Sequence, residues 1–244
     1  MRSFSYKEYQ YLINWLQSKY KFYSFFDIDE SVNSYCIIRH DVEFSIDRAL
    51  SLAFIEKSLN VQSTYFIQIR NNTYNALSNE NIKKIQMIAD MGHHIGLHVH
   101  TGLLNEYSSI EDLILQDITI LSKMINRKVN VFSYHRPTID LLLTPVNIDG
   151  YLNAYDDVFF HAYDTQNIPV NLNVKYISDS NHMWKYGYPT TVSHPKLQIN
   201  FHPFSWSESG YENTVNFKTL IDEKHHELVI SMNNEIKTFP IELL

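Results

Sequence analysis

Carboxylate and imidazole side chains stand two residues apart at two places in the chain. Asp41 and Glu43 form one pair, and His98 and His100 form the other. Residues i and i+2 of a strand point to the same side, so both members of each pair can project into one site. A carboxylate with two imidazoles is a sufficient ligand set for catalytic zinc, which keeps one position open. The pairs therefore predict a divalent-metal site in which the second carboxylate acts as a base on water.

Each of these patterns also has a purely structural reading. A His-x-His pair at a strand end is commonly a hydrogen-bonded polar pair. Asp41 and Glu43 can serve as turn and cap residues before a helix that begins near Ser45. What favours the functional reading is the number of such clusters.

Nearly every apolar segment of the sequence ends in ionisable residues. The clusters are Arg39-His40-Asp41-Val42-Glu43, His98-Val99-His100, Tyr134-His135-Arg136-Pro137, Asp179 and His202-Pro203. The carboxyl ends of parallel strands lie on one face of a sheet or barrel, where ligands bind. Five clusters are expected to converge there, and Arg136 would hold the carboxylate base ionised by charge pairing.

The elements that must position these residues alternate along the first half of the chain. Strands are expected near 35–38, 63–69, 94–100, 129–133, 174–178 and 197–201, and helices near 6–19, 45–59, 78–91 and 113–125. Such alternation predicts right-handed βαβ units and an α/β fold with a parallel sheet. An open doubly wound sheet and a (β/α) barrel both fit. The second half is poor in helical pattern, which argues against a regular eightfold barrel.

Composition limits the function classes. The chain has 244 residues, 20 Lys and Arg against 27 Asp and Glu, and a net charge of −7. An acidic chain without a basic stripe is a poor nucleic-acid binder. A single cysteine, Cys36, excludes an internal disulfide framework and a multi-cysteine zinc site.

The same survey bears on organisation and location. The sequence has no repeat and no Pro/Gly/Ser linker, which predicts one catalytic domain over residues 1–244. It has no run of about 18 apolar residues that would span a membrane. Lys7 and Glu8 stand where a signal peptide would need its apolar core, so a cytoplasmic protein is expected.

At these motifs the sequence resembles the polysaccharide deacetylase family, the NodB-homology carbohydrate esterases, over roughly residues 35–206. The motif-bearing segments are Arg39–Glu43, Gly92–His98, Ser133–Pro137, Asp179–Trp184 and Leu197–Pro203. The resemblance implies a distorted or incomplete (β/α) barrel. It also implies that Asp41 is the general base, Glu43 the metal carboxylate and His98 the first metal histidine. Arg136 would orient Asp41, and Asp179 would tune His202, the general acid.

Three positions depart from the family pattern. The second metal histidine usually lies four residues after the first, where this chain has Gly102. His100 is the substitute that strand geometry favours, with His135 and His161 as open alternatives. Glu43 replaces the usual metal aspartate, and Arg136 is followed directly by proline where the family has Arg-x-Pro.

The resemblance implies a metal-dependent deacetylase, with zinc as the expected metal and an amino-sugar-containing substrate. The expected reaction removes an N-acetyl or other N-acyl group from a cytosolic intermediate of O-antigen or capsule synthesis. Two alternatives stay open. One is a catalytically silent carbohydrate-binding protein on the same fold, and the other is a hydrolase of another amide or of an N-formyl group.

Overall fold

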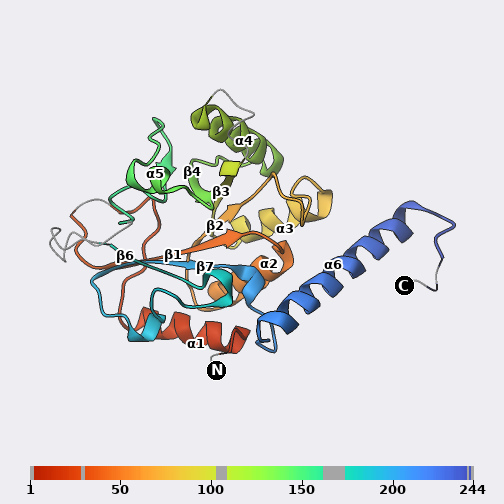
Figure 1. Cartoon of the computed structure of the whole chain (residues 1–244), viewed down its shortest axis with the longest axis horizontal. Helices are drawn as coiled ribbons and strands as arrows, with labels where there is room; N and C mark the ends of the chain where they lie inside the picture. The colour runs from red at the N-terminus through yellow and green to blue at the C-terminus, as the bar shows by residue number, and fades with distance from the viewer. Residues whose placement is uncertain (1–2, 29–30, 103–108, 162–173, 241, 243–244) are drawn as a thin grey trace.

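The computed structural model describes residues 3–28, 31–102, 109–161, 174–240 and 242, and a single parallel sheet lies at its centre (Figure 1). The seven strands run in the order β5-β4-β3-β2-β1-β7-β6. They are β1 (Tyr35–Val42), β2 (Thr64–Ile67), β3 (His94–His100), β4 (Val131–His135), β5 (Leu152–Asn153), β6 (Lys175–Ser178) and β7 (Lys196–Phe201). The predicted α/β class and parallel sheet are confirmed. The two-residue strand β5 was not predicted.

Helices follow the strands as the sequence pattern indicated. They are α1 (Tyr6–Gln17), α2 (Ile46–Ser58), α3 (Asn79–Asp90), α4 (Ile110–Ile125), α5 (Ile139–Leu143) and α6 (Asn213–Glu235). Four of them begin at a serine whose side chain accepts a backbone N–H from the first turn, namely Ser5, Ser45, Ser78 and Ser109. The second half of the chain is richer in helix than predicted, because α6 runs for 23 residues.

The sheet curls so that its two edges approach each other across the inner face. Tyr155, just after edge strand β5, accepts a hydrogen bond from Arg39 on central strand β1 at 2.9 Å. Tyr176, on the opposite edge strand β6, lies with its ring 5.8 Å from the same guanidinium. Phe160 bridges the two tyrosines, with ring centroids 4.8 and 5.3 Å away. The fold is therefore a curled half-barrel, and the prediction of a distorted or incomplete (β/α) barrel is confirmed.

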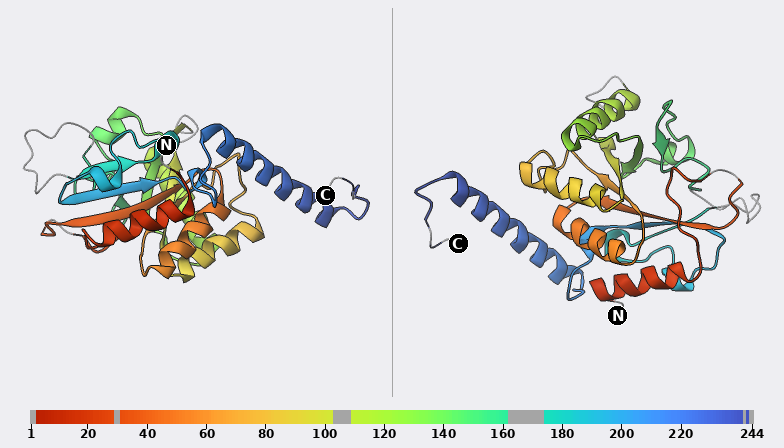
Figure 2. Two further views of the ribbon diagram at one scale, coloured as in Figure 1. Left: turned by 90° about the horizontal axis from the view of Figure 1, so that it is seen from below. Right: turned by 180° about the vertical axis from the view of Figure 1, so that it is seen from behind.

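Strand β1 separates two environments because its side chains alternate between the faces of the sheet. Arg39 and Asp41 point to the inner face, where they meet residues of β7 and the segment after β5. His40 points to the outer face, where it contacts Glu56 of α2 and Tyr9 of α1. The outer face is packed by helices (Figure 2). The inner face borders a cavity.

Among the described residues, no helix combines the length and the apolar character needed to cross a membrane.

Candidate active site

A cavity of about 920 Å³ opens on the inner face of the half-barrel. Asp41, Glu43, His98, Arg136 and His202 all contribute to its wall. They come from β1, β3, β4 and β7 or from the residue directly after the strand, so the predicted convergence of strand ends occurs. Aromatic rings line much of the remaining wall: Phe44, Tyr134, Tyr155, Phe160, Tyr176, Tyr186, Phe204 and Phe217.

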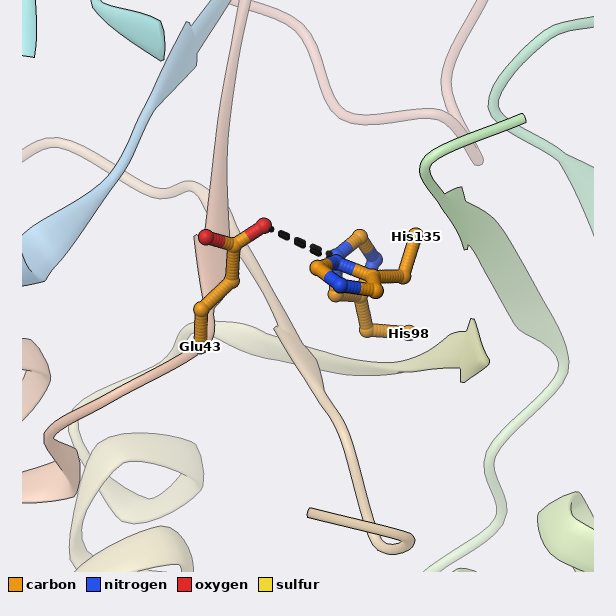
Figure 3. Close-up of side chains that lie close together, drawn as sticks. All are labelled: Glu43, His98 and His135. Atoms are coloured by element: carbon orange, nitrogen blue, oxygen red, sulfur yellow. Dashed lines mark hydrogen bonds and ion pairs between the residues drawn. The ribbon is translucent and has the colours of Figure 1, made fainter. Parts of the chain in front are cut away.

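Three side chains form a group that could hold a metal ion. The ligand atoms of Glu43, His98 and His135 all lie within 4.8 Å of one another (Figure 3). Glu43 Oε1 is 3.0 Å from His135 Nδ1 and 3.6 Å from His98 Nε2. Burial of Glu43 favours its neutral acid, but the two imidazoles and the charge of His202 outweigh burial and hold the pKa of Glu43 well below its usual range.

The ring of His98 is oriented as a metal-ligating histidine requires. Its Nδ1 lies 2.9 Å from the hydroxyl of Ser133 on the neighbouring strand β4. Its Nε2 is buried and has no hydrogen-bond partner. A buried polar atom without a partner is uncommon and calls for a ligand, and a fixed second nitrogen sets the tautomer of such a ligand. Two imidazoles and one carboxylate are the donor set that zinc accepts, so these residues fit a divalent ion.

Asp41 lies beside this group with one oxygen occupied and the other open. Its Oδ2 accepts hydrogen bonds from Arg39 and Asn200, both at 2.8 Å. Its Oδ1 receives only a long hydrogen bond from Ser133, at 3.4 Å. Burial raises the pKa of Asp41, but the charges of Arg39, His98 and His202 together outweigh burial and lower the pKa. Asp41 is therefore ionised and holds a free oxygen beside the ligand group.

His202 and Asp179 form a second pair, which borders the first group because His202 Nε2 lies 3.9 Å from Glu43 Oε1. Asp179 Oδ1 accepts both the backbone N–H and the Nδ1 of His202, each at 2.8 Å, and its Oδ2 accepts the indole N–H of Trp206 at 2.7 Å. Burial lowers the pKa of His202, but the hydrogen bond and charge of Asp179 reverse this and raise the pKa to about 9. At neutral pH His202 is an imidazolium whose Nε2 is left for a substrate.

Most of the predicted site residues gather here, and two lie differently from the prediction. Arg39 takes the place beside Asp41 that was predicted for Arg136. Arg136 has a left-handed backbone, with a φ of 50°, and its carbonyl accepts a hydrogen bond from Thr101. It lines the cavity, but the described contacts of Asp41 do not include it.

His100 was predicted as a metal ligand, and the structure gives that place to His135, one of the open alternatives. The His100 ring lies over the following turn, where a Cβ built on Gly102 would come within 3.1 Å of it. Its Nδ1 has no hydrogen-bond partner, but His100 does not join the ligand group. His161 lines the cavity and accepts a hydrogen bond from the backbone N–H of Val174.

Three residues of the site were not singled out from the sequence. Arg39 and Asn200 stand two positions before Asp41 and His202, so the alternation of a strand would have placed them on the inner face. Ser133 is opposite His98 in the register of β3 and β4, a pairing that the sequence does not disclose.

Comparisons with known proteins extend to distant structures only. No protein-family model matches the sequence, and no curated protein matches it significantly. A family 4 carbohydrate esterase from Bacillus anthracis is similar, with 15% identity and a TM-score of 0.43 over 88% of this chain and 85% of that one. A polysaccharide deacetylase from Bacillus cereus has 11% identity and a TM-score of 0.41 over 78% and 88% of the two chains.

A CE4 family pseudoenzyme from Bacillus anthracis is also similar, at 15% identity and a TM-score of 0.41. The match covers 82% of this chain but only 63% of that protein. The resemblance indicated by the sequence motifs recurs in these structures. At such identities and TM-scores the similarity carries no inference about activity, which depends on the side chains of this chain.

Proposed function

We propose that the protein is a metal-dependent hydrolase that removes an N-acetyl or other N-acyl group from an amino sugar. The observation that carries the proposal is the presence of two different charged groups at one cavity, to whose wall Glu43, His98 and His202 contribute. The first is an open group of Glu43, His98 and His135 with the ionised Asp41 beside it. The second is the His202–Asp179 pair, which is held in its protonated form.

Glu43, His98 and His135 would hold the ion, and zinc is the metal that their donor atoms suit best. A bound divalent ion supplies Lewis acidity, which polarises an acyl oxygen and lowers the pKa of water. Ser133 fixes the ring of the ligand His98 through Nδ1.

Asp41 is the proposed general base. Arg39 and Asn200 hold its Oδ2, so the proton of the attacking water goes to Oδ1. The water oxygen forms a bond to the acyl carbon. Because Arg39 has no measurable exposure, this hydrogen-bonded geometry is shielded from solvent.

His202 is the proposed general acid. When the bond between acyl carbon and nitrogen breaks, Nε2 of the imidazolium gives its proton to the departing nitrogen, because an amide nitrogen leaves poorly as an anion. Asp179 keeps the remaining Nδ1–H in place. The products are the free amine and the carboxylic acid, whose proton balances the water consumed.

The substrate class rests on the sequence resemblance together with the form of the cavity. A concave wall of aromatic rings with a few charged groups is typical of a small-molecule site. The amino sugar, the cytoplasmic location and a place in O-antigen or capsule assembly stay predictions of the sequence.

The test is release of acid from a panel of N-acetylated and N-formylated amino sugars, with the protein depleted of metal and then reloaded with zinc. We expect acetate release that depends on zinc. Formate release alone would identify a different acyl specificity. Zinc-loaded protein that binds these sugars without releasing acid would instead establish the silent carbohydrate-binding protein.

A further inference from the structure

Among the described residues, the hydrogen bonds, ion pair and ring contacts that join the C-terminal helix α6 to the body lie in its first half, and Val229 is the buried side chain of its second half. Asn216 and Leu220 are buried in the first half, and Glu223 pairs with Arg48 at 2.8 and 3.1 Å. The second half extends away from the body in every view (Figures 1 and 2). A helix segment without tertiary contacts is only marginally stable in water, so this half is expected to have a partner.

One face of α6 carries four large apolar side chains that solvent reaches. Phe217, Ile221, Leu228 and Met232 are 37, 65, 58 and 42% exposed. Their spacings of four, seven and four residues place them on one stripe of a helix. Asn216, Leu220 and Glu223, which face the body, lie on a different side of the same helix. The apolar stripe is therefore open to solvent at Ile221, Leu228 and Met232, and Phe217 is partly covered by the body.

The four apolar residues of the stripe have the same spacing when the helix is read from either end. The midpoint of the stripe lies between Lys224 and His225, with Ile221 and Leu228 equally far from it, and Phe217 and Met232 equally far beyond them. A surface that maps onto itself when reversed is what a two-fold symmetric contact requires. We propose that α6 packs antiparallel against α6 of a second copy of this chain, with Ile221 on the partner's Leu228 and Phe217 on the partner's Met232.

The charges beside the stripe agree with this pairing. In an antiparallel two-fold pair, each flank of one helix faces the same flank of the other. Lys224 then lies near the partner's Glu227 on one flank, and Asp222 lies near the partner's His225 on the other. Within one helix Lys224 already pairs with Glu227 at 2.8 and 3.1 Å, so the partner's pair would join it in a four-residue network. The self-complementary apolar spacing, together with this network, points to a second copy of the chain.

The pairing would reach the cavity. Phe217 packs on Phe204 and Phe44 with ring centroids 5.7 and 6.1 Å away, and all three rings line the cavity. The partner's Met232, seated on Phe217, would support this wall from behind. The inference does not depend on the proposed hydrolase activity, and its test needs no turnover.

The first experiment measures molar mass by light scattering across micromolar concentrations. We expect twice the 28.8 kDa of one chain for the wild type. The double variant Ile221→Asp, Leu228→Asp should be a monomer with a folded body, since both side chains are largely exposed. Any loss of helical circular dichroism should be confined to the second half of α6. Leu77→Asp, at a site that is 52% exposed outside α6, is the matched control and should stay dimeric. A monomeric wild type, or a dimer that survives the double variant, would overturn the proposal.

The second experiment fixes the direction of pairing by oxidation of introduced cysteines. Native Cys36 is buried and free, so it gives no background. The double variant Ile221→Cys, Leu228→Cys should form a covalent dimer. Ile221→Cys alone should not, because the two copies of that residue lie seven residues apart along the axis, about 10 Å, and a disulfide needs Cβ atoms about 4 Å apart. A covalent dimer of the single variant, or none of the double variant, would refute the antiparallel register.

Discussion

Two carboxylate–histidine clusters lie on opposite faces of the sheet beside strand β1. They differ in how many of their polar atoms have hydrogen-bond partners. On the outer face, Glu56 accepts hydrogen bonds from Tyr9, His40, Ser63 and Tyr65 at 2.6 to 2.9 Å, so both of its oxygens have two donors. On the inner face, the carboxylate of Glu43 has one hydrogen bond among the described residues, from His135 at 3.0 Å. The first cluster is closed by helices, and the second faces a cavity.

The difference shows that a carboxylate beside two histidines is not by itself a metal site. His40 also has one unpaired ring nitrogen. Its other nitrogen, however, already contacts Glu56, and the described residues of the outer face do not bring three ligand atoms together. What distinguishes the inner cluster is that Glu43 and the Nε2 atom of His98 keep unused ligand positions at one point. The outer cluster is expected to govern stability, and the inner one chemistry.

The largest effect on chemistry is expected from Asp41→Asn. Loss of a general base lowers turnover by about 10²- to 10⁴-fold. Because Asp41 is not in the ligand group, the zinc content should stay that of the wild type. Acetate release and elemental analysis on the same preparation check both expectations. Turnover near the wild-type rate would remove Asp41 from the role of base.

The matched change on the outer face is Glu56→Gln, which should act on stability alone. Removing one partner from a buried ion pair costs about 3–5 kcal/mol, measured as the free energy of unfolding in urea. Zinc content and acetate release of the folded variant should be unchanged. A loss of zinc binding in the folded variant would contradict the separation of the two clusters.

The same variant has a pH signature. Burial raises the pKa of Glu56, but the charge and hydrogen bond of His40, together with His93 and Tyr9, outweigh burial and lower the pKa to about 2. A carboxylate whose pKa is lower in the folded than in the unfolded protein stabilises the fold above its unfolded pKa, which is near 4.3 for glutamate. This stabilisation is lost as the pH falls through the pKa of the folded state. The stability difference between wild type and Glu56→Gln should therefore shrink between about pH 4 and pH 2. A difference independent of pH in that window would show that Glu56 is not ionised in the fold.

Paired arginine variants sharpen the description of the inner cluster. Arg39→Gln removes a hydrogen bond of 2.8 Å from Asp41, and a displaced base can cost about 10²-fold in rate. The expected loss is in kcat, with less effect on KM. Arg136→Gln leaves all described contacts of Asp41 in place, so kcat should be retained. The reverse outcome would restore the sequence-based prediction that Arg136 orients Asp41.

The smallest change is expected from Asp179→Asn, as a shift in pH dependence. Asp179 is the main group that raises the pKa of His202 to about 9, with further contributions from Glu43 and Asp41. A general acid is lost as the pH rises through its pKa. The alkaline limb of the pH–rate profile should therefore move from near 9 toward the ordinary histidine value of about 6.5. An alkaline limb that stays in place would show that another group sets it.

Much of this architecture could be predicted from the strand periodicity of the sequence and the rules of parallel-sheet topology. The alternation of strands and helices predicted the parallel sheet, and the i, i+2 rule placed Asp41 with Glu43 on the inner face. The sequence favoured His100 over His135 as the metal ligand, because it does not disclose the turn at Gly102 or the register of β3 with β4, on which the choice depends. The family motif led to the prediction that Arg136 orients Asp41. In the structure Arg39, which lies on the same strand as Asp41, donates the hydrogen bond to it. Helix α6 was missed because its two halves have different surroundings.

The most direct test of the central claim is the zinc content of three proteins: wild type, His135→Ala and His100→Ala. Both substitutions remove an imidazole from the ends of adjacent strands, but only His135 belongs to the ligand group. We predict about one zinc per chain in the wild type, the same in His100→Ala, and a large loss in His135→Ala. Full zinc content in His135→Ala, or its loss in His100→Ala alone, would contradict the assignment of the metal site.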